Sequence, residues 1–131
     1  DDMAYVIHAE ASELTGIGHV RKEPLETFLK NSRQWGIYRV GRDSAVRNNI
    51  ALRALHYADA HTLFDMAFDL DYDDKVYCTQ LVALAINQAI GETLIVPGSK
   101  LNGRPFYAVD DLYLFPEMKC VVASAPRREG K

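Results

Sequence analysis

The sequence predicts an α+β fold, because its strand-like and helix-like stretches fall in separate runs. Runs rich in β-branched and aromatic residues lie near both ends of the chain, at residues 3–9 and 119–124. Two longer stretches between them, residues 44–60 and 78–90, repeat apolar residues at helical spacing. Neither an internal repeat nor a linker interrupts this order, so residues 1–131 are expected to form a single domain.

In the first half of the chain, local signals mark where each element begins. Tyr5, Val6 and Ile7 have high β-propensity. Pro24 fits the first turn of a helix, where its missing N–H would have no helical partner. A longer helix can be capped by Asp43 or by the serine that follows it. The expected elements are a strand at residues 3–9, loop and short extended structure at 10–22, a helix at 24–31, a strand at 36–40 and a helix at 44–60.

In the second half, the strongest signal is the apolar helix that follows Cys78. Its inward positions are expected at Leu81, Val82, Ala85, Ile86 and Ala89. The glycine that comes after this helix is a suitable C-terminal stop. The other expected elements are an aspartate-rich loop or turn at residues 64–74, a loop at 97–105, a helical turn at 108–112, a strand at 119–124 and a loose basic tail at 127–131.

The composition is that of an ordinary globular domain, and it argues against several kinds of partner. Hydrophobic residues make up 48% of the chain and charged residues 25%, which suffices for a core. The net charge of −3 gives no reason to expect a nucleic acid or an acidic membrane surface as a partner. No apolar run approaches the roughly 20 residues that span a bilayer.

Cys78 lies where an acidic, polar run gives way to an apolar helical pattern. This places its sulfur at a helix N-terminus, where backbone N–H groups lack helical acceptors and the helix dipole is positive. Both favour the thiolate, the nucleophilic form of the side chain. Cysteine is also commonly a small buried hydrophobe, and Cys120, which alternates with Met118 and Val122, is expected to be buried in this way. A disulfide between the two cysteines would consume the Cys78 thiol.

A cysteine nucleophile needs a base, and a polar group that orients the base. His8 lies on the first predicted strand, where one interpretation is a hydrogen-bonded structural residue. Another makes His8 the base and Glu10 its orienting group, because residues two apart on a strand share a face. His19 lies among loop signals and is expected at the surface.

No metal site is expected in this chain. Asp69, Asp71 and Asp73 imitate the start of a calcium loop. However, Asp74 stands where that loop needs glycine, and Gln80 stands where it needs a bidentate glutamate. An acidic loop in contact with solvent is the better interpretation.

Several segments resemble one known family. Tyr77-Cys78-Thr79-Gln80-Leu81-Val82 resembles the Tyr-Cys-Ser-Glu-Leu/Val segment of the YiiX-like cysteine hydrolases. These are circularly permuted relatives of the NlpC-type papain-like amidases, and they are related to the lecithin:retinol acyltransferase group. Tyr5-Val6-Ile7-His8-Ala9 is similar to the second strand of the family, and Phe64-Asp65 to the Tyr-Asp before its cysteine helix. The resemblance covers most of residues 3–90. It implies a permuted papain-like fold in which a small antiparallel sheet packs against the cysteine-bearing helix.

The resemblance also implies roles for single residues. Cys78 is the nucleophile and His8 orients the base, whereas Glu10 and Tyr77 support the site. Asp65 braces the active-site loop, although it could equally be an ordinary turn or cap residue. Gln80 replaces the glutamate usual in the family, which is expected to alter a local hydrogen bond and not the nucleophile.

The base of the family is a histidine in a Ser/Thr-His-Val-Gly-Ile-like motif, one strand before the segment that resembles Tyr5–Ala9. That motif does not occur in residues 1–131. The chain is therefore expected to lack the N-terminal strand with the catalytic histidine. Asp1 and Asp2 are expected at the tip of the hairpin that would join this strand to the next one.

The sequence thus predicts a thiol hydrolase or acyltransferase that cleaves an amide or an ester through an acyl-enzyme on Cys78. By resemblance, its substrates are peptidoglycan-type peptides, isopeptide-like amides or lipid acyl groups, no cofactor is required, and a bacterial cell envelope or secreted location fits. A catalytically inactive family member that serves as a binding or interaction module is the alternative. The missing histidine motif and Gln80 motivate that alternative. The sequence leaves the oligomeric state open.

Overall fold

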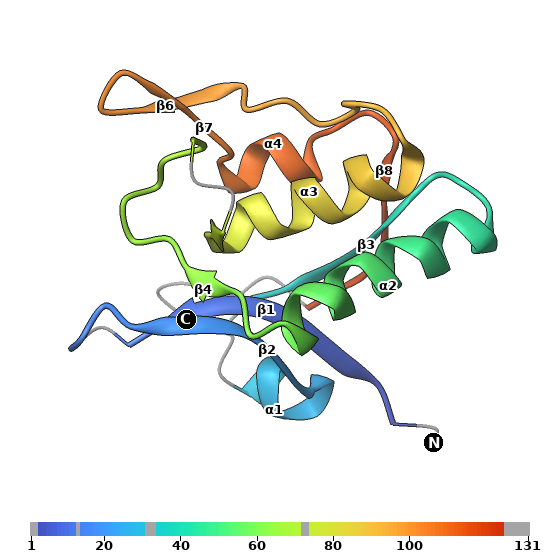
Figure 1. Ribbon diagram of the computed structural model, residues 1–131. Helices are drawn as coiled ribbons and strands as arrows, with labels where there is room; N and C mark the ends of the chain where they lie inside the picture. The colour runs from blue at the N-terminus through green and yellow to red at the C-terminus, as the bar shows by residue number, and fades with distance from the viewer. Residues whose placement is uncertain (1–2, 13, 31–33, 72–73, 125–131) are drawn as a thin grey trace, which may run out of the picture.

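The computed structural model describes residues 3–12, 14–30, 34–71 and 74–124. Helices and strands are mixed, and the predicted α+β class is confirmed (Figure 1). In chain order the elements are β1 (Tyr5–Ala11), β2 (Gly18–Pro24), α1 (Leu25–Lys30), β3 (Gly36–Val40), α2 (Ser44–Asp59), β4 (Leu63–Phe64), β5 (Lys75–Val76), α3 (Cys78–Ile90), β6 (Ser99–Leu101), β7 (Arg104–Phe106), α4 (Val109–Tyr113) and β8 (Met118–Ala123).

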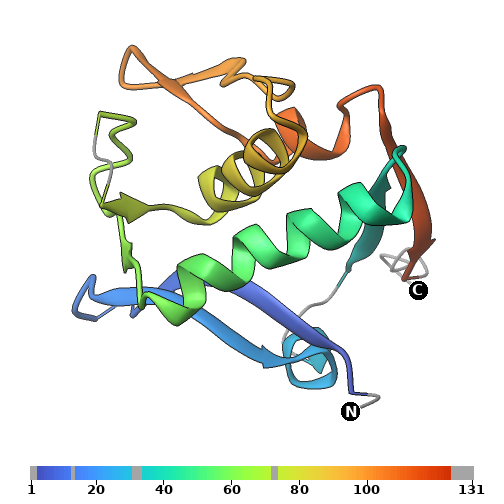
Figure 2. The same cartoon turned by 45° about the vertical axis from the view of Figure 1, so that its right-hand side comes forward.

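The main sheet has the strand order β1-β2-β4-β5. β1 and β2 form an antiparallel hairpin in which Ala9 lies opposite Val20 and His8 opposite Arg21. β4 pairs antiparallel with β2 and parallel with β5. Helices α2 and α3 lie on one side of this sheet and the short α1 on the other, as Figures 1 and 2 both show. The two sides of β1 therefore face different surroundings, and this decides what its side chains can reach.

Two smaller antiparallel pairs complete the fold. β3 pairs with β8, and this pair brings residues near 40 and 120 together. β6 and β7 form a hairpin that projects beyond the start of α3 (Figure 1). The hairpin turns at Asn102 and Gly103, which both have positive φ angles of 53° and 81°. An Asn-Gly pair with this geometry is a strong signal for a two-residue hairpin.

The core has two adjoining parts, and α3 contributes to both. In one, Ala9 and Val20 of the sheet pack with Ala58 of α2, Val76 and Leu81. The other gathers Val40, Tyr77, Ala83, Ile86, Ile95 and Tyr107. Because one helix fills both parts, its position fixes the distance between the main sheet and the C-terminal half of the domain.

Several expected elements need correction. Residues 18–24 form a regular strand instead of loop, because β2 is held between β1 and β4. At its start, a Cβ on Gly18 would lie 1.8 Å from the Glu10 carbonyl oxygen, so only glycine fits there. Residues 99–106 form a hairpin where a loop was expected. The expected hairpin tip at residues 1–2 and the basic tail at 127–131 lie outside the described residues.

The expectations for two side chains were also wrong. Cys120 is exposed and free, because it lies on β8, whose only partner in the described chain is β3. Val82, expected to point inward, is 39% exposed. The helix that carries it is otherwise the best buried element of the domain. None of the helices built from described residues is long and apolar enough to cross a membrane.

Replacing Leu81 with alanine is expected to destabilise the domain. Leu81 is 1% exposed and packs in the core between α3 and the sheet, so its truncation should lower the free energy of unfolding by about 2–5 kcal/mol. Leu52→Ala is the matched control, because Leu52 is 62% exposed and its truncation should change stability by less than about 0.5 kcal/mol. Urea denaturation measures both, and equal effects would contradict this account of the core.

Candidate active site around Cys78

Cys78 is the first residue of α3, and its side chain is exposed while the residues around it are buried. Tyr77 caps the helix with extended backbone angles, and Tyr77, Thr79 and Gln80 are all buried. Cys78 is a free thiol. The sequence-based placement of the sulfur at a helix N-terminus is therefore confirmed. The Cys78 side chain is therefore accessible to solvent and lies at the positive end of the dipole of a 13-residue helix.

The side chain of Gln80 closes the first turn of this helix. Its Oε1 accepts a hydrogen bond from the Tyr77 backbone N–H at 3.1 Å. This is one half of a capping box, in which the N3 side chain reaches back to the N-cap N–H. A glutamate carboxylate can accept the same hydrogen bond, so this contact does not support the expectation that Gln80 alters a local hydrogen bond.

The two residues that flank Cys78 both bind the same stretch of backbone. The Tyr77 hydroxyl accepts a hydrogen bond from the Tyr107 N–H at 3.0 Å, and the Thr79 hydroxyl donates one to the Tyr107 carbonyl oxygen. The Tyr77 ring also stacks on Phe106, with centroids 5.1 Å apart and planes 17° apart. These contacts fix the start of α3 against the end of β7 and turn Cys78 toward the surface.

Burial raises the pKa of the Tyr77 phenol above its ordinary value. The pKa of Tyr107 is raised for the same reason. Both phenols are thus kept neutral in the folded protein to a higher pH than in the unfolded chain. Tyr77 therefore acts next to the sulfur as an uncharged hydrogen-bonding group.

Asp65 holds the loop between β4 and β5. It is 1% exposed, and its two carboxylate oxygens accept hydrogen bonds from the Ala67 N–H at 2.9 Å and the Asp69 N–H at 2.8 Å. Asp69 in turn lies 2.9 Å from Arg104 of β7. The loop is thereby tied to the β6–β7 hairpin close to the start of α3. These contacts would brace the active-site loop, and they are also the contacts that an ordinary turn residue makes.

His8 does not lie with Cys78. Its neighbour Ala9 packs against Leu81 in the core, and successive side chains of a strand point to opposite faces. The His8 ring accordingly faces α1, where it contacts Phe28 edge-on at 5.2 Å. Its Nε2 lies 3.3 Å from a Glu23 carboxylate oxygen, an ion pair when the imidazole is protonated, but without the alignment of a hydrogen bond.

Glu10 shares this face of β1, as the strand period predicts. Its carboxylate lies 3.5 Å from Arg21, and both side chains are about half exposed. The structure brings Glu10, His8, Arg21 and Glu23 together in one charged cluster on the side of the sheet that faces away from α3. Cys78 is not part of it.

The other histidines occupy surface positions. His19 is exposed, as expected, and its ring lies 5.6 Å from that of His61 in an edge-on contact. His56 contacts the ring of Tyr57 on α2. Within the described ranges, the histidine rings contact Val20, Glu23, Phe28, Tyr57 and one another, and no three His, Cys, Asp or Glu side chains group as metal ligands.

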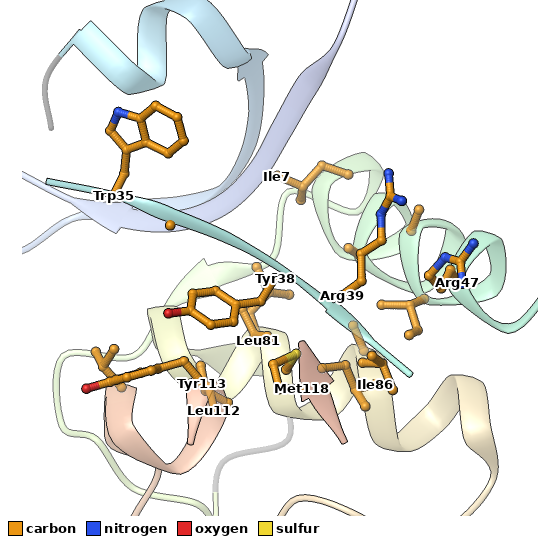
Figure 3. Close-up of a pocket in the computed structure, with 18 of the residues that line it drawn as sticks. Ile7, Trp35, Tyr38, Arg39, Arg47, Leu81, Ile86, Leu112, Tyr113 and Met118 are labelled. Atoms are coloured by element: carbon orange, nitrogen blue, oxygen red, sulfur yellow. The ribbon is translucent and has the colours of Figure 1, made fainter. Parts of the chain in front are cut away.

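A groove of about 1060 Å³ runs along α3 and was not foreseen in the sequence. Figure 3 shows Leu81 and Ile86 of α3 in it, with Tyr38 and Tyr113 on one side of β3 and Arg39 on the other. Cys78 does not line the groove itself. However, the lining residues Leu81 and Val82 follow Cys78 by three and four positions, so they continue its face of the helix. The lining of the groove on α3 therefore begins about one helical turn after Cys78.

The sequence model of a family described as "permuted papain-like amidase enzyme, YaeF/YiiX, C92 family" matches residues 1–111 of the chain. No curated protein and no solved structure matches the chain. The match spans every element from β1 to the start of α4, including Cys78, His8, Glu10, Asp65 and Tyr77.

The raised pKa of Tyr77 predicts a loss of stability at alkaline pH. Because the unfolded chain gives up this phenolic proton near pH 10 and the folded protein holds it longer, unfolding releases protons above pH 10. The free energy of unfolding should then fall as the pH rises. Tyr77→Phe should show a smaller fall between about pH 9 and 11, measured by urea denaturation. Tyr38→Phe, at an exposed position, is the control, and equal slopes in the two variants would contradict the prediction.

Proposed function

We propose that this chain, which belongs to the permuted papain-like amidase family of YaeF and YiiX, is a cysteine hydrolase or acyltransferase that acts through Cys78. The observation that carries the proposal is the exposed free thiol at the N-terminus of a helix whose first turn is otherwise buried. A structural cysteine would be expected to pack with its neighbours. Here the neighbours on both sides are buried and only the sulfur-bearing residue is turned outward.

The reaction begins with attack of the Cys78 Sγ on the carbonyl carbon of an amide or ester. The C=O electron pair moves to oxygen, and the resulting oxyanion lies near the Cys78 N–H and the positive end of the α3 dipole. Collapse of this intermediate expels the amine or alcohol, which takes up a proton from the general acid. The product is a thioester on Cys78. Water or another acceptor then attacks the thioester and regenerates the thiol.

We assign the proton transfers to an imidazole that comes from a segment preceding Asp1. One observation supports this assignment: the described histidines lie on the α1 face of β1 or at the surface. Such an imidazole takes the proton of the Cys78 thiol as the sulfur attacks.

The class of substrate follows from the family and from the form of the site. We propose a peptide-like amide as substrate, such as a peptidoglycan-type peptide or an isopeptide, and place lipid acyl esters second. Tyr77 and Asp65 support the site by holding the helix start and the β4–β5 loop. The competing function is an inactive binding module, and the separation of His8 from Cys78 is the observation that favours it.

The proposal predicts that Cys78 is much more reactive than Cys120, although both thiols are exposed. With iodoacetamide near pH 7, Cys78 should be alkylated at least tenfold faster than Cys120, because Cys78 lies at the N-terminus of α3 whereas Cys120 lies on a strand. Mass spectrometry of digested protein measures both sites in one sample. Cys78→Ala should abolish hydrolysis of an activated amide or ester, while Cys120→Ala should leave it within about twofold. Equal alkylation rates would favour the inactive binding module.

The orienting role of His8 remains a prediction, and kinetic and stability measurements on a His8 variant can distinguish it from a purely structural packing role. If His8 orients the base, His8→Gln should lower kcat about 10²-fold or more and leave the melting temperature nearly unchanged. If His8 only packs between Phe28 and Glu23, the variant should lower the melting temperature and leave kcat within a few fold. Glu10→Gln is the control on the same face of β1, because Glu10 is exposed.

A further inference from the structure

The groove beside α3 carries two positive charges and no negative one. Arg39 of β3 and Arg47 of α2 both line it, and no aspartate or glutamate is found among its described lining residues. The chain as a whole has a net charge of −3, so the charge in the groove is opposite in sign to that of the whole protein. A cleft lined by one sign of charge attracts ligands of the other sign.

Neither of these two arginines is neutralised by a carboxylate in the described part of the chain. The arginine ion pairs there are made by Arg21, Arg42 and Arg104. Figure 3 shows the guanidinium groups of Arg39 and Arg47 on the side of β3 toward α2. A guanidinium pairs strongly with a carboxylate, because its N–H groups form a planar fork that matches the two oxygens.

The face of α3 in the same groove is apolar. Leu81, Val82, Ala85 and Ile86 line it at the spacing of one helical face. Val82 is 39% exposed there. A ligand that fits both parts of the groove therefore has apolar side chains and a negatively charged group.

Helices α2 and α3 run antiparallel, and this locates the two ends of the groove. Ala58 near the end of α2 shares one part of the core with Leu81 near the start of α3. Asn49 near the start of α2 donates a hydrogen bond to the Ala89 carbonyl oxygen, near the end of α3, at 3.2 Å. The start of α2 therefore lies beside the end of α3 that is far from Cys78.

Both arginines belong to this distant end of the groove. Arg47 lies near the start of α2, and Val40, the neighbour of Arg39, shares one part of the core with Ile86. From Cys78 to Ile86 the helix rises about 12 Å. About four residues of an extended peptide cover the same length.

We propose that the groove binds an acidic peptide segment of the substrate, with apolar side chains on α3 and a carboxylate, about four residues from the scissile amide, between Arg39 and Arg47. This rests on the proposed function, because it specifies the substrate class of the Cys78 site. A peptide fits the groove better than an alkyl chain does. Ser44 and Asn48 of α2 also line the groove, and their side chains can hydrogen-bond to a peptide backbone but not to an alkyl chain.

The test measures how fast peptide iodoacetamides alkylate Cys78, with Cys120 in the same sample as the internal reference. Each probe carries the iodoacetyl group at the N-terminus of an apolar hexapeptide with either glutamate or glutamine as its fourth residue. At low salt the glutamate probe should alkylate Cys78 at least about fivefold faster than the glutamine probe, and high salt should reduce this ratio. The ratio at Cys120, which does not line the groove, should be close to one.

Arginine variants show whether the two guanidinium groups cause this preference. Loss of both charges, in Arg39→Gln combined with Arg47→Gln, should bring the ratio at Cys78 to about one, and the single variant Arg39→Gln should lower it partway. Arg47→Lys keeps the charge and should retain most of the ratio. Arg53→Gln is the matched control and should leave the ratio unchanged, because Arg53 is exposed on α2 and does not line the groove.

Equal rates with the glutamate and glutamine probes would overturn the proposal, as would a preference that survives the loss of both arginines. An alkyl iodoacetamide of the same length that ends in a carboxylate is the third probe. If it labels Cys78 faster than the peptide does, and the arginine variants lose this advantage, the occupant is a lipid acyl group and the peptide is excluded.

The readout is a ratio of two rates at one exposed thiol, so it does not require an activated Cys78. A preference for glutamate at a Cys78 that is no more reactive than Cys120 toward iodoacetamide itself would refute only the proposed function. A reactive Cys78 without that preference would refute only the acidic peptide.

Discussion

The attachment of the start of α3 to the backbone of Tyr107 is the constraint on which the rest of the site depends. Two neighbours of the cysteine hold the backbone of Tyr107, at its N–H and at its carbonyl oxygen. Tyr77 accepts its N–H and Thr79 donates to its carbonyl oxygen. Tyr77 and Thr79 are thereby held in the interior, and the side chain of Cys78 between them points outward. The exposure of Cys78 is thus a product of core packing, because a buried polar group is stable only when its hydrogen bonds are satisfied.

The same packing explains why the Cys78 thiol and the His8 imidazole are separated. Ala9 is small enough to lie under α3, so it faces the core, and the pleat of β1 then sends His8 to the other side. There the His8 ring contacts Phe28 and lies close to the Glu23 carboxylate. A shift of β1 by one residue would reverse these faces, but it would also bury the charged row that includes Glu10 and Arg21. The register is therefore strongly specified, and with it the position of His8.

The groove beside α3 lies where the cysteine-bearing helix meets the edges of the two sheets. One apolar face of α3 lines the groove, with Val82 exposed and Leu81, Ala85 and Ile86 buried, and the strands β1 and β3 that flank it have one partner each in the described chain. An apolar stripe and open sheet edges are costly features in a finished fold.

The sequence by itself determined the α+β class, the two long helices, the placement of Cys78 at a helix start and, through ordered short motifs, the family. These are local properties: Asp43 accepts a hydrogen bond from Val46 N–H at its own helix end, and Gly91 ends α3 with a positive φ. Only the tertiary structure decided that residues 18–24 are a strand, that Cys120 and Val82 are exposed, and that His8 faces away from Cys78. Each of these features depends on which other element packs against a strand or helix. When that element is distant in the sequence, no local sequence pattern predicts the contact.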